Sequence, residues 1–400
     1  MIICKIWDAD YPWDIRVEKV CRSLQQKHEV HLVCRNTKRR PTYEQLDGIF
    51  IHRLPALSTA VGQLNAAIGF PVFFNPLWLY TIWRTIRESR AELILVRDLP
   101  LALTAIIVGR WFKIPVVIDL AENYPAMLQD RLRFTPTGLL GRLLRHPAPA
   151  RLIEKLALGL VDHIIVVVAE SLDRLLEMGV RPNRISIVSN TPPLDRWRLC
   201  DHTETQLDGR ERIHLVYLGN LDGSRGIDIA IQAVRLLKDM GQHAQLSIIG
   251  TGQNIKQFRS LATHLGVTDR VAIMGQLPFS RVRSIMAEAH VGLIPHYATN
   301  AWNTTIPNKL FDFMAMGKPV IVSSALPTKR IVTEEQCGLV FQERDHKDLA
   351  RAIIRMADPQ LREEQGRRGR VAVAIKYHWS VDEGRLMAAI ETAASARRLR

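Results

Sequence analysis

The sequence has few cysteines and lacks the long hydrophobic run that a membrane-spanning helix needs. The five cysteines are odd in number and form no Cys-x-x-Cys spacing, which argues against a disulfide framework and against a zinc site. The longest apolar stretch, residues 69–83, is too short for a bilayer and contains Pro71 and Pro76. No signal peptide precedes the first apolar run. We therefore expect a cytoplasmic protein without a membrane-spanning segment, and we expect neither a metal nor an organic cofactor.

Acidic residues are also in deficit. The chain has 54 Lys and Arg residues against 40 Asp and Glu residues, a formal net charge of +14. Such an excess favours an anionic partner: nucleic acid, an acidic lipid surface or a phosphorylated small molecule. With 400 residues, of which 47% are hydrophobic, the chain is long enough for two domains, each with its own core.

Short apolar runs alternate with longer amphipathic segments, and this alternation is typical of βαβ units with a parallel sheet covered on both faces. In the first half the predicted strands are 2–7, 29–34, 92–97, 115–120, 163–168 and 184–190. In the second half they are 213–220, 244–252, 270–276, 291–296, 319–324 and 338–341.

A polar stretch without periodicity separates the two sets, and we place a domain boundary near 192–211. The predicted fold class is α/β, with two doubly wound Rossmann-like domains facing a cleft. They are an N-terminal domain of residues 1–195 and a C-terminal domain of residues 196–376. A C-terminal helix, 377–400, is predicted to cross back to the first domain.

Three turns of the second half are suited to an anion. The stretch "YLGNLDGSRGIDIA" places Arg225 at a helix entrance after a glycine-punctuated turn, and "IIGTGQNIKQF" repeats the glycine pattern. In "TTIPNKLFDFMAMGKP", Pro307 suits a first helical turn, Gly317 suits a helix end, and Lys309 lies beside amides that the helix leaves unpaired. If all three turns lie at the same edge of one sheet, they would form a single pocket. The alternative for each turn is an ordinary strand-to-helix connection with a solvated cation.

These residues carry a resemblance to a known family. The second half resembles the nucleotide-sugar-binding domain of the retaining family 4 glycosyltransferases, which have the two-domain GT-B architecture. The matching segments are, in order, "YLGNLDGSRGIDIAIQA", "LSIIGTG", "VAIMGQLP", "AEAHVGLIP" and "NKLFDFMAMGKPVIVSS". The first half resembles the family in "DIRVEKVCRSLQQKHEVHLVCR", "VDHIIVVVAESLDRLLEMGV" and "ISIVSNTP".

The resemblance implies roles for individual residues. Arg225 would hold the donor diphosphate, amides at Pro307 to Lys309 would cap its distal phosphate, and Asp312 would bind the nucleotide ribose. Thr304 stands where the family has the first acid of a glutamate pair, so we interpret Lys309 as a compensating phosphate ligand. The other residues implied in donor binding are Gly219, Asn220, Gly250, Gly252, Thr305, Ile306 and Asn308.

In the first half, "VVIDLAENYP" lies where relatives have an aspartate-x-histidine-glutamate sequence, with Ala121 in place of the histidine. Glu122 is a third candidate catalytic residue, beside Arg225 and Lys309, and the alternative is a helix-start acid. Asn123 is a possible cleft contact. The stretch "YPWDIRVEK" replaces a glycine-rich loop, and its Asp14 and Arg16 are candidates to reach a phosphate across the cleft; a structural ion pair is the alternative.

The segment 131–155 has six basic residues against one acid, interleaved with Leu139, Leu140, Leu143 and Leu144. A basic amphipathic helix of this kind can lie in a lipid interface, which would place the protein peripherally on the inner face of the plasma membrane. The alternative is that these leucines belong to the core and the arginines face water.

The sequence thus predicts an enzyme that transfers a sugar from a nucleotide diphosphate-sugar donor to a glycan or polyprenyl-linked acceptor, with retention of anomeric configuration, in cell-surface polysaccharide biosynthesis. No nucleic acid partner is expected. Two alternatives stay open: a nucleotide-sugar epimerase of the same fold, and a basic binding protein without turnover. The residues Ala121 and Thr304, which depart from the family pattern, keep the second alternative open.

Overall fold

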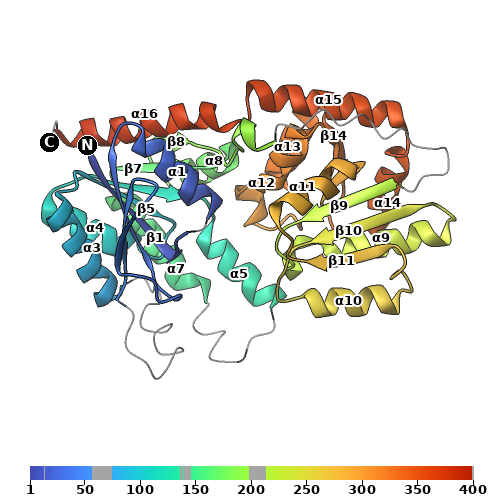
Figure 1. Cartoon of the computed structure of the whole chain (residues 1–400), viewed down its shortest axis with the longest axis horizontal. Coiled ribbons are helices and arrows are strands. Elements are labelled where there is room, and N and C mark those ends of the chain that lie inside the picture. Colours follow the sequence, from blue (N-terminus) through green and yellow to red (C-terminus); the bar gives the residue numbers. More distant parts are fainter. Residues whose placement is uncertain (13, 56–73, 136–137, 139–145, 198–212, 399–400) are drawn as a thin grey trace. The chain divides into compact units, whose positions relative to one another are not determined.

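A computed structural model describes residues 1–12, 14–55, 74–135, 138, 146–197 and 213–398, which form two compact units (Figure 1). Unit 1 comprises residues 1–125, 146–189 and 382–400, and unit 2 comprises residues 126–145 and 190–381. The leucines at 139, 140, 143 and 144, on which the amphipathic-helix prediction depends, lie outside the described residues, as do Pro71 and Cys200.

Unit 1 is built on an eight-stranded sheet with the order β3-β4-β2-β1-β5-β6-β7-β8. All neighbouring strands are parallel except the β3–β4 pair. The six strands predicted for this half are confirmed. The strands are β1 (Ile2–Asp10), β2 (Glu29–Arg35), β3 (Tyr43–Leu46), β4 (Ile49–Arg53), β5 (Leu93–Arg97), β6 (Val116–Leu120), β7 (His163–Val166) and β8 (Ile185–Ile187).

The antiparallel hairpin β3–β4 was not predicted. Its turn residues Asp47 and Gly48 both have positive φ, 49° and 78°. Two consecutive positive φ angles match the twist of a two-residue hairpin, and the dipeptide Asp-Gly is a strong signal for this turn. The sequence "EQLDGIFIH" therefore contained the signal, although β3 alternates between exposed and half-buried residues and is only four residues long.

The helices of unit 1 connect these strands, except for the C-terminal helix. They are α1 (Ile15–Gln25), α3 (Pro76–Ser89), α4 (Ala102–Phe112), α7 (Pro147–Leu160), α8 (Ala169–Glu177), the short η1 (Pro182–Arg184) and, from residue 382, α16 (Trp379–Arg398). Helix α1 starts at Asp14, whose carboxylate accepts hydrogen bonds from the amides of Arg16 and Val17. Helices α3 and α7 start after Asn75 and His146 with a proline in the first turn, where a missing N–H costs nothing.

Unit 2 has a six-stranded parallel sheet with the order β11-β10-β9-β12-β13-β14. The strands are β9 (Ile213–Leu218), β10 (Ala244–Ile249), β11 (Val271–Gly275), β12 (Val291–Ile294), β13 (Val320–Ser323) and β14 (Gly338–Phe341), as predicted. The chain reverses direction across this sheet between β9 and β12. In doubly wound sheets, ligands bind beside the carboxyl ends of the strands at such a switch point.

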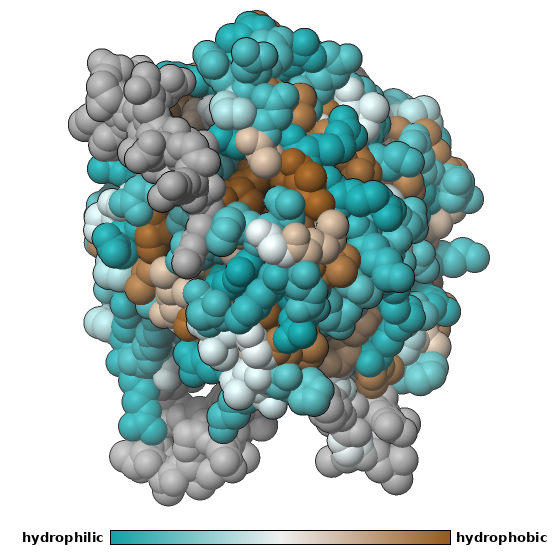
Figure 2. Space-filling model, turned by 90° about the vertical axis from the view of Figure 1, so that its right-hand side faces the viewer, coloured by the Kyte–Doolittle hydropathy of each residue, from teal (hydrophilic) through white to brown (hydrophobic). Residues whose placement is uncertain are grey.

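The helices of unit 2 are α5 (Tyr124–Phe134, from residue 126), α9 (Ile227–Asp239), α10 (Ile255–His264), α11 (Phe279–Glu288), α12 (Asn308–Ala315), α13 (Leu326–Glu335), α14 (His346–Arg355) and α15 (Pro359–Ile375). Short 3-10 turns, η2 (Leu194–Trp197), η3 (Gly223–Arg225) and η4 (Trp302–Thr304), complete it. The apolar sides of α9 and α14 pack against each other over a core of fully buried residues such as Leu215, Ile231 and Leu246. Figure 2 shows a face that is mainly hydrophilic, with smaller apolar areas between hydrophilic side chains.

Candidate functional site

Three loops that follow strands of unit 2 are tied together by backbone hydrogen bonds at the switch point. The amide of Leu221, after β9, donates to the carbonyl of Thr251, after β10, at 2.9 Å, and Asn254 N–H donates back to the Leu221 carbonyl at 3.1 Å. The amide of Tyr297, after β12, donates to the carbonyl of Ser224 at 3.0 Å. The loops after β9, β10 and β12 therefore form one surface.

Two glycines permit this close approach. Gly250 has φ 138°, and a Cβ placed on it would lie 1.8 Å from the carbonyl oxygen of Gly219. Gly226 has φ 65°, and its Cβ would lie 1.9 Å from the carbonyl oxygen of Pro295. Any side chain at either position would force these loops apart, because both the backbone conformation and the space require glycine.

Arg225 and Lys309 face one cluster of side chains. The Arg225 guanidinium carbon lies 4.2 Å from the ring centroid of Trp302, whose ring centroid is 4.1 Å from that of His296. The Nε2 atom of His296 lies 3.3 Å from the Lys309 ammonium, which in turn lies 4.0 Å from the ring centroid of Tyr217. Arg225 and Lys309, which are predicted to bind a diphosphate, are thus linked by the contacts of Trp302 and His296, and Tyr217 packs against Lys309.

Basic side chains outnumber acidic ones in this cluster. Lys309 is only 7% exposed, and this burial lowers its pKa well below the ordinary value. The charge of Arg225 lowers the pKa further, whereas Asp312 raises it in part. In the part of the chain that the structure describes, neither cation has an ion-pair partner within 4.0 Å. Two neighbouring cations without a paired carboxylate favour an anion between them.

Lys309 lies in the first turn of α12. Pro307 is the N-cap residue with an extended conformation and the helix begins at Asn308, one residue later than the sequence suggested. Proline has no N–H, so the amides of Asn308 and Lys309 are the donors in this turn. No side chain caps the helix, while Ile306 is buried and Thr305 half-buried just before it.

The remaining residues with roles implied in donor binding lie on α12, on η4 and in the loops after β9 and β10. One oxygen of the half-buried Asp312 accepts a hydrogen bond from the indole N–H of Trp197 at 2.8 Å. The hydroxyl of Thr304 donates to the backbone carbonyl of Asn300 at 2.7 Å. Asn220 is exposed, and its amide group donates to Asp222. Gly252 packs against the Asn220 side chain and the backbone of Leu221.

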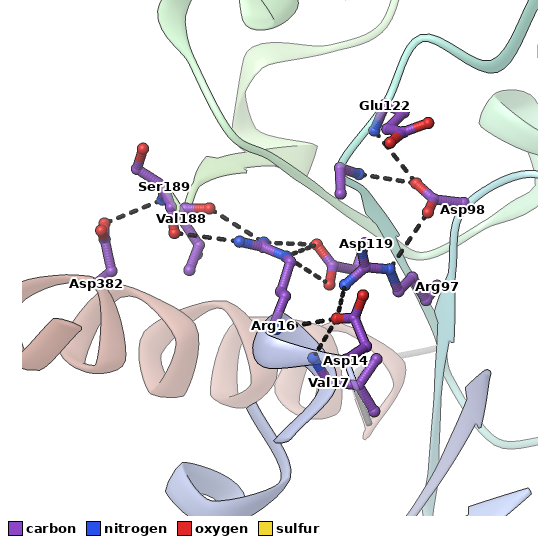
Figure 3. A network of polar contacts seen from close by, with 11 residues as sticks. Asp14, Arg16, Val17, Arg97, Asp98, Asp119, Glu122, Val188, Ser189 and Asp382 are labelled. Carbon is purple, nitrogen blue, oxygen red and sulfur yellow. Dashed lines mark hydrogen bonds and ion pairs between the residues drawn. The ribbon is translucent and has the colours of Figure 1, made fainter. Parts of the chain in front are cut away.

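In unit 1 the Arg16 guanidinium is buried and hydrogen-bonded to protein groups (Figure 3). It donates to both carboxylate oxygens of Asp119, with the shortest distance 2.7 Å, and to the carbonyls of Val188 and Ser189 at 3.1 Å each. The ion pair that the sequence left open as the alternative for Arg16 is present, and its partner, Asp119, was not predicted. Asp14 caps α1 and accepts a hydrogen bond from Arg97 at 3.1 Å.

Glu122 is exposed, at the carboxyl end of β6, whereas Asn123 is buried. The sequence reasoning missed Asp98, which follows β5 and has the left-handed φ of 56°. Its carboxylate accepts the amides of Ala121 and Glu122 at 2.9 and 3.2 Å (Figure 3). Burial raises the pKa of Asp98 to about 7, although Arg97 acts in the opposite direction.

Within the described residues, no three His, Cys, Asp or Glu side chains are grouped so that they could hold a metal ion. The chain does contain an Asp-x-Asp sequence at 8–10, which the sequence reasoning passed over. Its Asp10 accepts hydrogen bonds from the amide and hydroxyl of Thr37. None of the helices in the described ranges is both long and apolar enough to cross a membrane.

Two doubly wound, mainly parallel sheets are typical of the GT-B fold, and the comparisons with known proteins agree with it. Residues 14–191 match the model of the "Glycosyl transferase 4-like domain", and residues 212–358 match that of "Glycosyl transferases group 1". Together the two matches cover most of the chain. The protein therefore belongs to this family of two-domain glycosyltransferases.

A curated relative and two solved structures give the range of similarity. The putative colanic acid biosynthesis glycosyltransferase WcaL of Salmonella typhimurium is 27% identical over 180 residues, which are 44% of this chain and 43% of WcaL. Sucrose-phosphate synthase from Thermosynechococcus elongatus is 19% identical with a TM-score of 0.81, covering 99% of this chain and 100% of that structure. Anabaena HepE, solved in complex with UDP, is 14% identical with a TM-score of 0.73, covering 98% and 100%. At these identities the two structures establish the fold.

Proposed function

We propose that the protein transfers a sugar from a nucleotide diphosphate-sugar to a glycan or polyprenyl-linked acceptor, with retention of anomeric configuration, in cell-surface polysaccharide biosynthesis. The observation that carries this proposal is the convergence of Arg225 and Lys309 on one cluster beside the uncapped start of α12. That arrangement suits a diphosphate, since it combines two cations with two backbone donors.

Each part of the donor then has a place in unit 2. The diphosphate lies between Arg225 and Lys309, and the amides of Asn308 and Lys309 bind its distal phosphate. Asp312 contacts the ribose. The glycines at 219 and 250 let the backbone approach the phosphates closely.

Cleavage of the anomeric bond puts negative charge on the leaving diphosphate and positive charge on the sugar. Fixed donors at the diphosphate lower this barrier most, because they are already oriented when the charge develops. In this scheme residues 196–376 bind the donor, residues 1–195 bind the acceptor, and 377–400 return to the first domain. Glu122 is proposed to bind an acceptor hydroxyl, since its carboxylate is exposed at a strand end.

Incubation with a panel of nucleotide sugars tests this proposal. We expect slow release of nucleoside diphosphate from one member of the panel, because these enzymes hold the leaving group whether water or a sugar hydroxyl attacks. The measurement is chromatography of the released nucleotide. Conversion of the donor to its epimer without nucleotide release would show that the protein is an epimerase and not a transferase. If no donor reacts, the remaining interpretation is a binding protein without turnover.

We also propose that unit 1 binds an anionic membrane surface through α4 and α7. Helix α7 packs into the unit through one face, yet Leu152, Leu156 and Leu160 on another face are 61%, 50% and 39% exposed. On the neighbouring α4, Trp111 is 74% and Ile107 43% exposed. Leucines at a four-residue spacing form a continuous apolar stripe, which costs free energy in water.

The charges beside this stripe are basic. Arg151 and Lys155 flank it on α7, Arg110 and Lys113 lie near Trp111 on α4, and all four are exposed. The only acid of α7, Glu154, is buried in an ion pair with Arg174. An apolar stripe with basic neighbours fits the interface of a bilayer with anionic headgroups, where a polyprenyl-linked acceptor would also lie.

Flotation with vesicles tests the membrane proposal. The protein is expected to float with phosphatidylglycerol-containing vesicles at low salt, and less at high salt because screening weakens the electrostatic part. The double variant Leu152→Ser/Leu156→Ser should lose flotation. Leu326→Ser is the matched control, since Leu326 is 51% exposed on α13 of unit 2. Equal flotation with phosphatidylcholine vesicles, or loss in the control variant alone, would contradict the proposed surface.

A further inference from the structure

His296 is a deeply buried member of the cluster that contains Arg225 and Lys309. It follows β12 and is 2% exposed. Its Nε2 atom lies 3.3 Å from the Lys309 ammonium, and its Nδ1 atom has no hydrogen-bond partner among the described residues. The His296 ring is held against Trp302, and its carbonyl accepts the Ser323 hydroxyl. The orientation of this ring is therefore fixed by packing.

Two basic side chains in contact cannot both carry a proton in a buried site. The groups that face Lys309 are Tyr217 on β9, His296 after β12, Arg225 on η3 and Asp312 on α12. Of these, only Asp312 is acidic, and one of its oxygens already accepts from Trp197. Burial, Lys309 and Arg225 all lower the pKa of His296, so its ring stays neutral and can accept a hydrogen bond.

We propose that His296 and Lys309 form a buried basic pair that takes up a proton from solvent when a nucleoside diphosphate binds, with His296 as the positioning residue that accepts from the charged Lys309. This inference rests on the proposed function, because it takes the diphosphate site as given. The proton ends on the Lys309 amine. The resulting ammonium donates to the diphosphate and to Nε2 of His296, and the imidazole proton then resides on Nδ1.

The sign of the pH dependence follows from linkage. In the free protein the pKa of Lys309 is lowered by burial and by Arg225, and a bound diphosphate raises it again. Binding therefore adds a proton wherever the pH lies between the free and bound pKa values. In that range the affinity for the diphosphate falls up to about tenfold for each unit of rising pH.

Calorimetry with the intact chain measures this proton directly. UDP and GDP are titrated at about pH 8, where a terminal phosphate with a last pKa near 6 is already ionised and contributes no proton of its own. Inorganic pyrophosphate, which still holds its last proton at this pH, serves as a probe of binding alone. Two buffers with different ionisation enthalpies are compared. We expect the observed heat to depend on the buffer with the sign of proton uptake. Lys309→Arg should bind with buffer-independent heat, because a guanidinium is always charged.

Variants of His296 separate positioning from simple structural support. His296→Leu removes the acceptor, so the affinity for the probe should fall by about tenfold or more at pH 8 and by less at pH 6.5, where protonation of the amine is easier. In His296→Gln the amide oxygen can accept from Lys309, and affinity should recover. A loss that is equal at both pH values would indicate a structural role and contradict the inference.

Two outcomes distinguish this inference from the proposed function. If UDP or GDP binds tightly to the wild-type protein with buffer-independent heat, no proton is taken up, and the inference of a basic pair is wrong. The proposed diphosphate site would not be affected by that result. Failure of UDP, GDP and pyrophosphate alike to bind would overturn both.

Discussion

Replacement of Lys309 by methionine is expected to lower the turnover of a nucleotide-sugar donor by about 10²–10³-fold, as does the loss of one fixed donor to a developing oxyanion in other enzymes. Methionine has a similar length and suits the buried position, so the unit should fold. Arg225→Ala should have an effect of similar size. The measurement is the steady-state rate of nucleotide release, with the thermal unfolding of each variant as a check of folding.

Matched controls on α9 remove the same charges from the surface of the same unit. Lys238→Met breaks an ion pair with Asp269, and Arg235→Ala breaks one with Asp239. Both should leave turnover unchanged. Because Lys309 and Arg225 act on one leaving group, the double variant should lose less than the product of the two single effects. Unchanged rates in Lys309→Met and Arg225→Ala would remove the diphosphate site from the proposal.

All twelve predicted strands are present in the structure because each is a short apolar run between turn residues, and burial on both faces of a parallel sheet requires that pattern. The hairpin at 43–53 was missed, because half of β3 faces solvent and the apolar run is interrupted. The position of the candidate site also followed from the strands, since a switch point is a property of strand order.

The contacts that the site residues make with one another could not be predicted from the sequence. The predicted strand 291–296 includes His296, and no role was predicted for Trp302, although the Trp302 ring contacts both the His296 ring and the Arg225 guanidinium. No role was predicted for Asp98, which directly follows the predicted strand 92–97. The sequence does not show which residues that are distant in the chain contact one another. Arg225 and Trp302 are 77 positions apart in the chain, and the Asn300–Thr304 segment that presents Trp302 has no regular pattern.

The aromatic rings explain how two basic side chains can lie close together without a paired acid. Trp302 and Tyr217 offer the negative faces of their rings to Arg225 and Lys309, which offsets part of the mutual repulsion. The family pattern has a glutamate at the position of Thr304, and here that hydroxyl binds backbone carbonyls. The protein therefore supplies no acid at this position, and a bound anion can stabilise the protonated form of Lys309, which favours diphosphate binding.

Replacement of Arg16 by alanine is expected to destabilise the protein by about 3–5 kcal/mol, because it leaves Asp119 as an unpaired buried charge. Arg16 and Asp119 are 2% and 1% exposed, and the guanidinium also binds the carbonyls of Val188 and Ser189. The same segment is bound from the other side, where Ser189 N–H donates to Asp382 of α16 at 3.1 Å (Figure 3). Urea denaturation followed by circular dichroism measures the loss.

The pH dependence of this variant separates the ion pair from lost packing. Although burial alone would raise the pKa of Asp119, the charge and hydrogen bonds of Arg16 lower it to about 2. This stabilisation is complete above the unfolded pKa of about 3.9 and is lost as the pH falls toward 2, so the difference between wild type and Arg16→Ala should shrink on acidification. Arg22→Ala, on the exposed face of α1, removes a surface ion pair with Glu18 and should cost at most about 1 kcal/mol. A difference between wild type and Arg16→Ala that stays constant from neutral pH to acid would mean that packing, and not the Arg16–Asp119 pair, carries the effect.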